Sequence, residues 1–224
     1  RSALDAPFVS VESGDDDYLR GLFAASPEIG GGALLMALEH STTNGPWLLE
    51  ERFHKTNALL RYSHETAGGR FAVTAQGYDG EWRSTDQMPL RAVQSGALDR
   101  FGFVDPTNGG ESHRYTLAAD WYEQLGESRL HANAYAVDYR LDLFSNFTYA
   151  VDTENGDQFE QFDDRRVYGG QLNWTQPIDL MGLSHELDLG VELRRDDIDT
   201  VGLYKTVART RIDTTRADEV TQGS

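Results

Sequence analysis

The 224-residue sequence contains no cysteine, which excludes disulfide bonds and thiolate metal sites and is typical of an exported protein. It also lacks a long hydrophobic run, because the longest, Ala33–Leu38, has only six residues. A membrane-spanning helix needs roughly 20. Basic residues are scarce, with 20 Lys and Arg against 37 Asp and Glu, and the net charge of −17 argues against nucleic acid as a partner.

No signal peptide is visible, and the chain begins at Arg1 without methionine. We therefore expect a mature protein or a piece of a longer one. Hydrophobic residues make up 39% of the chain, which is low for a soluble globule, yet 11% aromatic residues is high for a disordered chain. A β-barrel reconciles the two values, since half of each strand is polar.

The clearest pattern is an alternation from Arg129 to Phe144, which predicts one long β-strand. Strands of soluble sheets usually have about five or six residues, whereas an outer-membrane barrel needs longer ones with an apolar outer face. We expect the large residues to face outward: Tyr135, Val137, Tyr139, Leu141 and Leu143. The opposite parity, predicted to face the lumen, holds Ala134, Ala136, Asp138, Arg140 and Asp142.

Similar segments recur along the chain. They are Pro7–Glu12, Tyr18–Ala25, Gly32–Ser41, Arg52–His64, Arg70–Trp82, Ser112–Tyr122, Arg129–Phe144, Arg165–Thr175 and His185–Arg194. A further segment, Val201–Ile212, alternates weakly and is either strand or loop. The predicted fold class is all-β: an antiparallel transmembrane β-barrel, partial, with about nine or ten strands of a larger barrel. Residues 1–224 are predicted to belong to a single outer-membrane barrel domain, with no plug domain in the chain.

Short and long connectors alternate between these segments. The short ones are Ser26–Gly31, Glu65–Gly69, Gln124–Ser128 and Gln176–Leu183, and the long ones are Thr42–Glu51, Arg83–Glu111 and Ser145–Asp164. Transmembrane barrels have tight turns on one side of the membrane and long loops outside. The pattern predicts that the long loops lie on the cell exterior.

Four other strands separate into an apolar and a polar face. The outward sets are predicted to be His54, Thr56, Ala58, Leu60 and Tyr62; Tyr115, Leu117, Ala119 and Trp121; Tyr168, Gly170, Leu172 and Trp174; and Leu187, Leu189, Val191 and Leu193. The lumen sets are Lys55, Asn57 and Arg61; Arg114, Thr116 and Asp120; Gln171 and Asn173; and Glu186, Asp188 and Glu192. Lumen charges of this kind keep a water-filled interior solvated.

All six histidines are predicted to face outward near strand ends: His40, His54, His64, His113, His131 and His185. Dispersed in this way, they indicate a lipid–water boundary rather than a metal or catalytic site. The same boundary is predicted for Trp82, Trp121, Trp174, Phe144 and Tyr62. The chain is accordingly not expected to be an enzyme, and no catalytic, cofactor-binding or metal-binding residue is predicted.

Three carboxylate clusters occur, Asp15–Asp17, Asp163–Asp164 and Asp196–Asp197, each placed in an outer loop or at the rim. Consecutive aspartates can bind Ca²⁺, but the spacing of an EF-hand loop is missing. Solvated loop charge is the better interpretation.

Several motifs resemble TonB-dependent receptors of the bacterial outer membrane. They are Glu81–Val93, Asp142–Tyr149, Gly156–Gln161, Asp164–Arg166, Asn44–Trp47 and Gly190–Asp197. The resemblance extends from about Tyr18 to Val220 and implies a location in the outer membrane of a Gram-negative cell. Members of this family are barrels filled by a plug domain. They take up siderophores, cobalamin, carbohydrates or metal chelates with energy transmitted by the TonB–ExbB–ExbD complex.

The resemblance implies three kinds of partner: outer-membrane lipid, a small-molecule ligand of unknown identity, and the TonB–ExbB–ExbD complex through a plug and a TonB box. The sequence contains neither of the last two elements. Alternatives are a passive porin-like channel and, from another functional class, an outer-membrane β-barrel enzyme with an acid–histidine pair at its rim. A soluble β-sandwich is a further alternative, although strands this long disfavour it.

Overall fold

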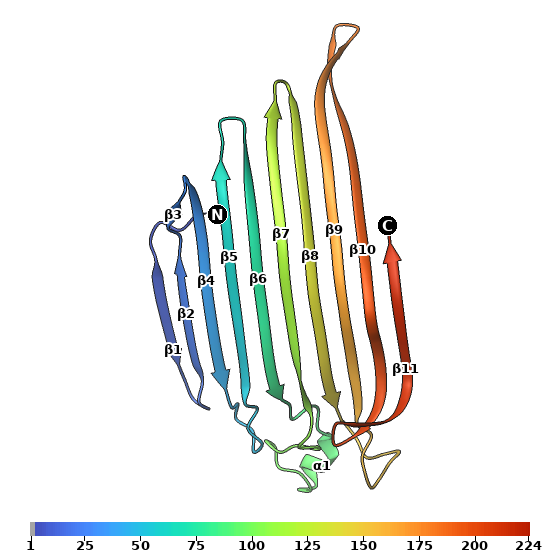
Figure 1. The fold of residues 1–224 in the computed structure, drawn as a ribbon. Coiled ribbons are helices and arrows are strands. Elements are labelled where there is room, and N and C mark those ends of the chain that lie inside the picture. Colours follow the sequence, from blue (N-terminus) through green and yellow to red (C-terminus); the bar gives the residue numbers. More distant parts are fainter. Residues whose placement is uncertain (1–2) are drawn as a thin grey trace.

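The computed structural model describes residues 3–224, which form one antiparallel sheet of eleven strands (Figure 1). The strands are β1 (Phe8–Ser13), β2 (Leu19–Ala25), β3 (Glu28–Ile29), β4 (Gly32–Thr43), β5 (Phe53–Glu65), β6 (Gly69–Arg83), β7 (Gly109–Leu125), β8 (Ser128–Ser145), β9 (Phe159–Leu180), β10 (Leu183–Val207) and β11 (Thr210–Gly223). One short helix, α1, spans Leu90–Gln94. Among residues 3–224 no helix is long and apolar enough to cross a membrane.

The strands follow one another as a meander, in the order β1-β2-β4-β5-β6-β7-β8-β9-β10-β11, with β3 paired to β4. The edge strands are β1 and β11. The predicted fold class is confirmed, with eleven strands in place of the expected nine or ten. Residues 1 and 2 of the predicted domain lie outside the described residues.

The connections divide the sheet into two ends. At one, here called the loop end, lie residues 44–52, 84–108 with α1, and 146–158; in Figure 1 it is at the bottom. At the other, the turn end, the strands are joined by short connections, including residues 66–68, 126–127 and 181–182. The predicted sorting of short and long connectors is confirmed.

The ambiguous segment Val201–Ile212 is strand, except for the turn at Ala208 and Arg209. Both turn residues have positive φ, 48° and 65°, as the tight turn of a hairpin requires. The β10–β11 pairing is shifted at three places, between Ile198 and Val201, Leu203 and Tyr204, and Lys205 and Thr206. Bulges interrupt the period of two, which explains the weak alternation.

Cross-strand pairing assigns the side chains to two faces. Leu60 lies opposite Ala75, and Ala75 opposite Leu117. Further along the sheet, Leu172 of β9 pairs with Val191 of β10. The four predicted outward sets of β5, β7, β9 and β10 therefore share one face, here called the apolar face. Its large side chains are exposed, for example Leu117 at 57%.

The opposite face contains the predicted lumen residues of the same four strands. Three hollows of the sheet are lined largely by residues of this face, so we call it the concave face.

Strand β8 corrects the sequence prediction. Ala136 lies opposite Leu117, so the even-numbered residues of β8 belong to the apolar face. The large set Tyr135, Val137, Tyr139, Leu141 and Leu143 faces the concave side instead. The cause is the two-residue turn Gly126–Glu127, which pairs Leu125 with Ser128 and so places odd residues of β7 beside even residues of β8. Side-chain size alone did not reveal this register.

The charges Asp138, Arg140 and Asp142 were also predicted wrongly, because they lie on the apolar-face side of β8. There they follow the small residues Ala134 and Ala136 toward the loop end. On the neighbouring strands the side chains of this face also change from apolar to charged toward the loop end. The face therefore has an apolar band and, nearer the loop end, a charged band.

The height of the apolar band can be estimated along β7. It extends from Trp121 to Tyr115, and His113 follows toward the loop end. At about 3.3 Å per residue this is about 20 Å along the strand. With the tilt of about 35–45° of membrane strands, it corresponds to a height of about 15 Å, a large part of the apolar belt of about 25 Å that membrane barrels present to lipid.

Candidate ligand-binding surface

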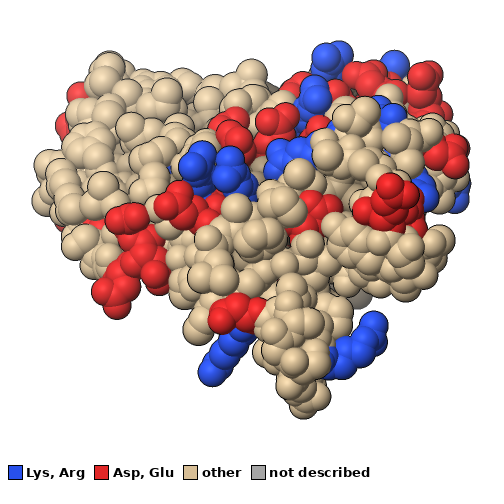
Figure 2. Space-filling view, turned by 90° about the horizontal axis from the view of Figure 1, so that it is seen from below, with Lys and Arg blue, Asp and Glu red and all other residues tan. Residues whose placement is uncertain are grey.

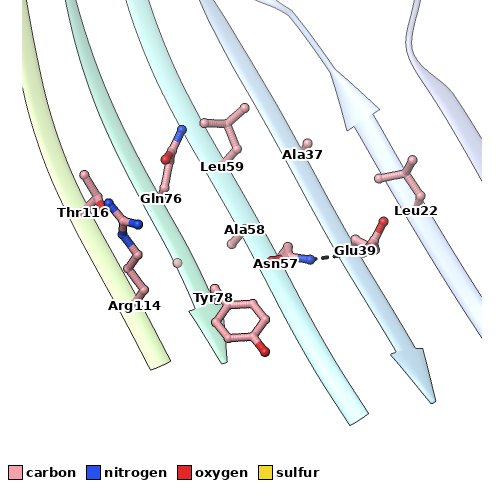
Figure 3. Close-up of a pocket in the computed structure, with 11 residues that line it drawn as sticks. Leu22, Ala37, Glu39, Asn57, Ala58, Leu59, Gln76, Tyr78, Arg114 and Thr116 are labelled. Carbon is pink, nitrogen blue, oxygen red and sulfur yellow. Dashed lines mark hydrogen bonds between the residues drawn. The ribbon is translucent and has the colours of Figure 1, made fainter. Parts of the chain in front are cut away.

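A row of directly opposed side chains crosses the concave face from β2 to β9. Its members are Leu22, Glu39, Asn57, Tyr78, Arg114, Tyr139 and Arg165. A hollow of about 520 Å³ lies along the first part of the row (Figure 3). A second, of about 740 Å³, extends from Arg114 across β8 and β9.

Most charges near this row are neutralised. Arg20 Nη2 donates a hydrogen bond to Glu39 Oε2 at 2.5 Å, and Lys55 Nζ lies 3.2 Å from Glu39 Oε1. Arg165 Nε donates to Asp163 at 2.7 Å. The concave face therefore holds prearranged ion pairs rather than a uniform field of one sign.

Apolar side chains interrupt this polar surface. Leu22 and Leu59 line the first hollow, and Val137, Tyr139 and Val167 line the second. The side chains are only half-buried. Apolar groups so placed gain free energy if another surface covers them.

At the loop end, a buried polar cluster joins two long loops to the turn after β10. Asp105 accepts hydrogen bonds from Thr107 Oγ1 at 2.5 Å, Asn146 Nδ2 at 2.9 Å and Gln158 Nε2 at 3.2 Å. Gln158 Oε1 accepts from Thr206 Oγ1 at 3.0 Å. Most side chains of this cluster are almost completely shielded from solvent, for example Asn146 at 0% and Gln158 at 1% exposure. We call Asp105, Thr107, Asn108, Asn146, Gln158 and Thr206 the loop hub.

Arginines attach β11 and its turn to this hub. Arg209 Nε donates to the Thr107 carbonyl at 2.6 Å. Arg211 forms two hydrogen bonds, of 2.6 and 2.5 Å, to Glu160, which is 2% exposed. Buried polar groups with all partners in place make a structure rigid. We therefore expect the loops to be held as a platform.

Within the loop 146–158, Asp157 accepts hydrogen bonds from three backbone amides. The donors are Ala150, Val151 and Asp152, at 2.8, 3.2 and 2.9 Å. These amides, chiefly that of Asp152, hold the pKa of Asp157 below its usual range. The amide of Asn155 similarly lowers the pKa of Asp152.

The platform exposes apolar side chains. Leu48, Leu90 and Val151 are 68%, 68% and 87% exposed. Seen from the loop end, acidic and basic groups are interspersed with broad uncharged areas (Figure 2). Two of the long loops predicted to lie on the cell exterior, 84–108 and 146–158, are thus joined through the hub, a connection that sequence reasoning missed.

Five of the six histidines lie on the apolar-face side as predicted, but His131 lies on the concave face beside Asp120, 2.7 Å away. Of the predicted boundary aromatics, Tyr62, Trp121 and Trp174 are on the apolar face. Trp82 is on the concave side. Phe144 is only 8% exposed.

The aspartate clusters differ from one another. Asp15–Asp17 occupies the turn between β1 and β2, as expected. The other two lie inside β9 and β10 and not in loops, where Asp163 pairs with Arg165, Asp196 with Arg194 and Asp197 with Arg195. Among residues 3–224 no group of three or more His, Asp or Glu residues could hold a metal ion.

No protein-family model and no curated protein sequence matches this chain. Solved structures do. The unliganded ferric citrate transporter FecA superimposes with a TM-score of 0.68 at 12% identity, covering 100% of this chain and 34% of FecA. This chain shares the fold of about a third of that transporter.

Two further solved structures are also similar. The ferripyoverdine receptor of the outer membrane of Pseudomonas aeruginosa, bound to ferripyoverdine, gives a TM-score of 0.62 at 12% identity, with 96% of this chain and 31% of the receptor covered. The FpvAI–pyocin S2 complex gives 0.61 at 12% identity with the same coverage. This chain spans about a third of each. The predicted resemblance to TonB-dependent receptors is thus confirmed at the level of the fold.

Proposed function

We propose that this chain forms part of the barrel wall of a TonB-dependent receptor in the outer membrane of a Gram-negative bacterium. Its loop platform captures a small-molecule ligand, such as a siderophore, another metal chelate, cobalamin or a carbohydrate. Uptake is driven by the TonB–ExbB–ExbD complex through a plug domain. The role is transport and not catalysis.

The concave-facing side of β8 carries this proposal. Tyr135, Val137, Tyr139, Leu141 and Leu143 present a nearly continuous apolar stripe along the inner wall. An open diffusion channel would leave this stripe in water, at a cost that grows with the apolar area exposed. A plug filling the barrel, together with a ligand held between plug and wall, would cover it.

Two further features support a membrane location. One face of the sheet carries a band of exposed apolar side chains, and the long loops gather at one end of the sheet, as in outer-membrane barrels. The similarity to FecA and to the ferripyoverdine receptor extends over nearly the whole chain.

The test is to sequence the coding region on both sides of this segment in its source DNA. The proposal expects a plug-like domain with a TonB box upstream and about a dozen further strands downstream, because transporters of this kind have 22 strands. A signal peptide directly before Arg1 together with a stop codon after Ser224 would contradict it and favour a small porin-like channel.

A further inference from the structure

One arginine of the concave face differs from its neighbours. Within residues 3–224, Arg114 has no ion pair and no side-chain hydrogen bond, whereas Arg20, Arg165 and Arg194 on the same face each contact a carboxylate. The guanidinium of Arg114 carries five N–H donors, and the residue is exposed on the concave face.

No acid lies directly or diagonally opposite Arg114. The two acids that line its hollows, Glu39 and Asp163, are each paired with another arginine, Arg20 and Arg165. Directly opposite it lie Tyr78 on β6 and Tyr139 on β8. The diagonal neighbours on both strands are uncharged as well: Gln76, Gly80, Val137 and Leu141. Figure 3 shows the Arg114 side chain extending along β7 toward Thr116, with Gln76 on the adjacent strand. Two of the three hollows of the concave face meet at this arginine.

We propose that Arg114 is the anchor of an anion-binding site that takes a carboxylate or a similarly planar anionic group of the transported ligand. The guanidinium fork matches a carboxylate in a bidentate geometry. Tyr78 and Tyr139 flank the bound group and offer hydroxyl donors and ring faces, and Gln76 and Thr116 supply further polar contacts. The hollows leave room for a molecule and not only for an ion.

This inference rests on the proposed receptor function, because it assigns the ligand a negative charge. Ligand binding is measured without energy coupling, so a failure of the anion site and a failure of the receptor function give different results. A protein that binds the anion but shows no TonB-dependent uptake would contradict only the receptor function. A receptor that does not bind the anion would contradict only the negative charge assigned to its ligand.

The experiment uses the protein as its source expresses it, extracted in detergent and labelled with ¹⁵N-arginine. The Arg114 Nε signal is assigned by its loss in R114Q. Titration with succinate is compared with succinamide, a neutral molecule of similar shape, at constant ionic strength. We expect a saturable shift of the Arg114 signal with succinate only. Affinities of the variants are measured by titration calorimetry, and succinate should bind at least about tenfold more weakly to R114Q, as for loss of a hydrogen bond to a charged group.

Arg20→Gln is the matched control, since Arg20 lies on the same face but already contacts Glu12 and Glu39. It should leave succinate affinity unchanged. R114K, which keeps the charge but not the fork, should bind with intermediate affinity. Folding of each variant is checked by its heat-dependent mobility in electrophoresis. A folded protein whose Arg114 signal does not shift, or shifts equally with succinamide, would overturn the proposal. So would an equal loss of affinity in R20Q.

Discussion

At the residue scale, the loop hub depends on Gln158, whose amide joins both long loops to β10. It donates to Asp105, Thr107 and Asn108 and accepts from Thr206 and from the Arg209 amide. Gln158→Ala leaves these buried partners unsatisfied, at a cost of about 2–4 kcal/mol.

We expect faster proteolysis of the loops 84–108 and 146–158 in Q158A, with the strands still protected. Thr153→Ala, an exposed change in the second loop, is the control and should behave as the unmodified protein. Equal cleavage of Q158A and the unmodified protein would mean that the hub does not hold the loops.

Asp157 gives a prediction for pH. Because its folded pKa is lowered, the ionised carboxylate stabilises the loop above the ordinary aspartate pKa of about 3.9, and this contribution is lost as the pH falls through the lower folded value. Amide exchange at Ala150, Val151 and Asp152, corrected for intrinsic rates, should therefore rise below about pH 4. Asp157→Asn should show fast exchange already at pH 7. Protection that stays constant down to pH 2 would contradict the assignment.

At the element scale, β8 shows what the sequence could and could not predict. Its existence, length and antiparallel partners follow from alternation and connector length. Its facing does not, because alanine is small on either face and the large Tyr135 and Tyr139 suggest the wrong one. The turn Gly126–Glu127 fixes the register of the β7–β8 hairpin. This register determines which side chains of β8 share a face with Trp121 and Leu117 of β7.

The loop hub could not be predicted for a different reason. Asp105, Asn146, Gln158 and Thr206 come from separate parts of the chain, and each has the composition of an ordinary loop or strand-end residue. Only the fold brings them together.

The facing of β8 can be tested with two neighbouring arginine substitutions. Ala134→Arg places a charge on the apolar face and should lower the free energy of unfolding in lipid vesicles by about 2–4 kcal/mol, as for arginine near a bilayer midplane. Tyr135→Arg on the concave face should cost clearly less. If urea titrations showed a larger loss of unfolding free energy for Tyr135→Arg than for Ala134→Arg, the large side chains of β8 would face lipid, as side-chain size suggests.

At the scale of the whole molecule, the sheet has two edges, β1 and β11. Strand edges in lipid leave amide and carbonyl groups without partners. We therefore expect the isolated 224-residue chain to form no stable conducting channel in planar bilayers. Steady single-channel currents from the purified chain would show that it closes a barrel by itself.

A deletion tests whether the loop 84–108 takes part in ligand capture. Removing Gln87–Phe103 takes out α1 but spares Asp105, Thr107 and Asn108 of the hub. In the receptor, ligand binding should be lost while the barrel still assembles. Unchanged ligand affinity, measured by titration on whole cells, would remove this loop from the binding surface.

The central claim is that the sheet stands in an outer membrane with its apolar face in lipid and its loops outside. The lack of cysteine makes single-cysteine labelling in cells the most direct test. Thr153→Cys in the long loop should react with a membrane-impermeant maleimide on intact cells, and Glu127→Cys in the short turn only after the outer membrane is opened. Leu117→Cys should react only with a lipid-soluble reagent. Labelling of Glu127→Cys on intact cells, or of Leu117→Cys by the impermeant reagent, would contradict the account.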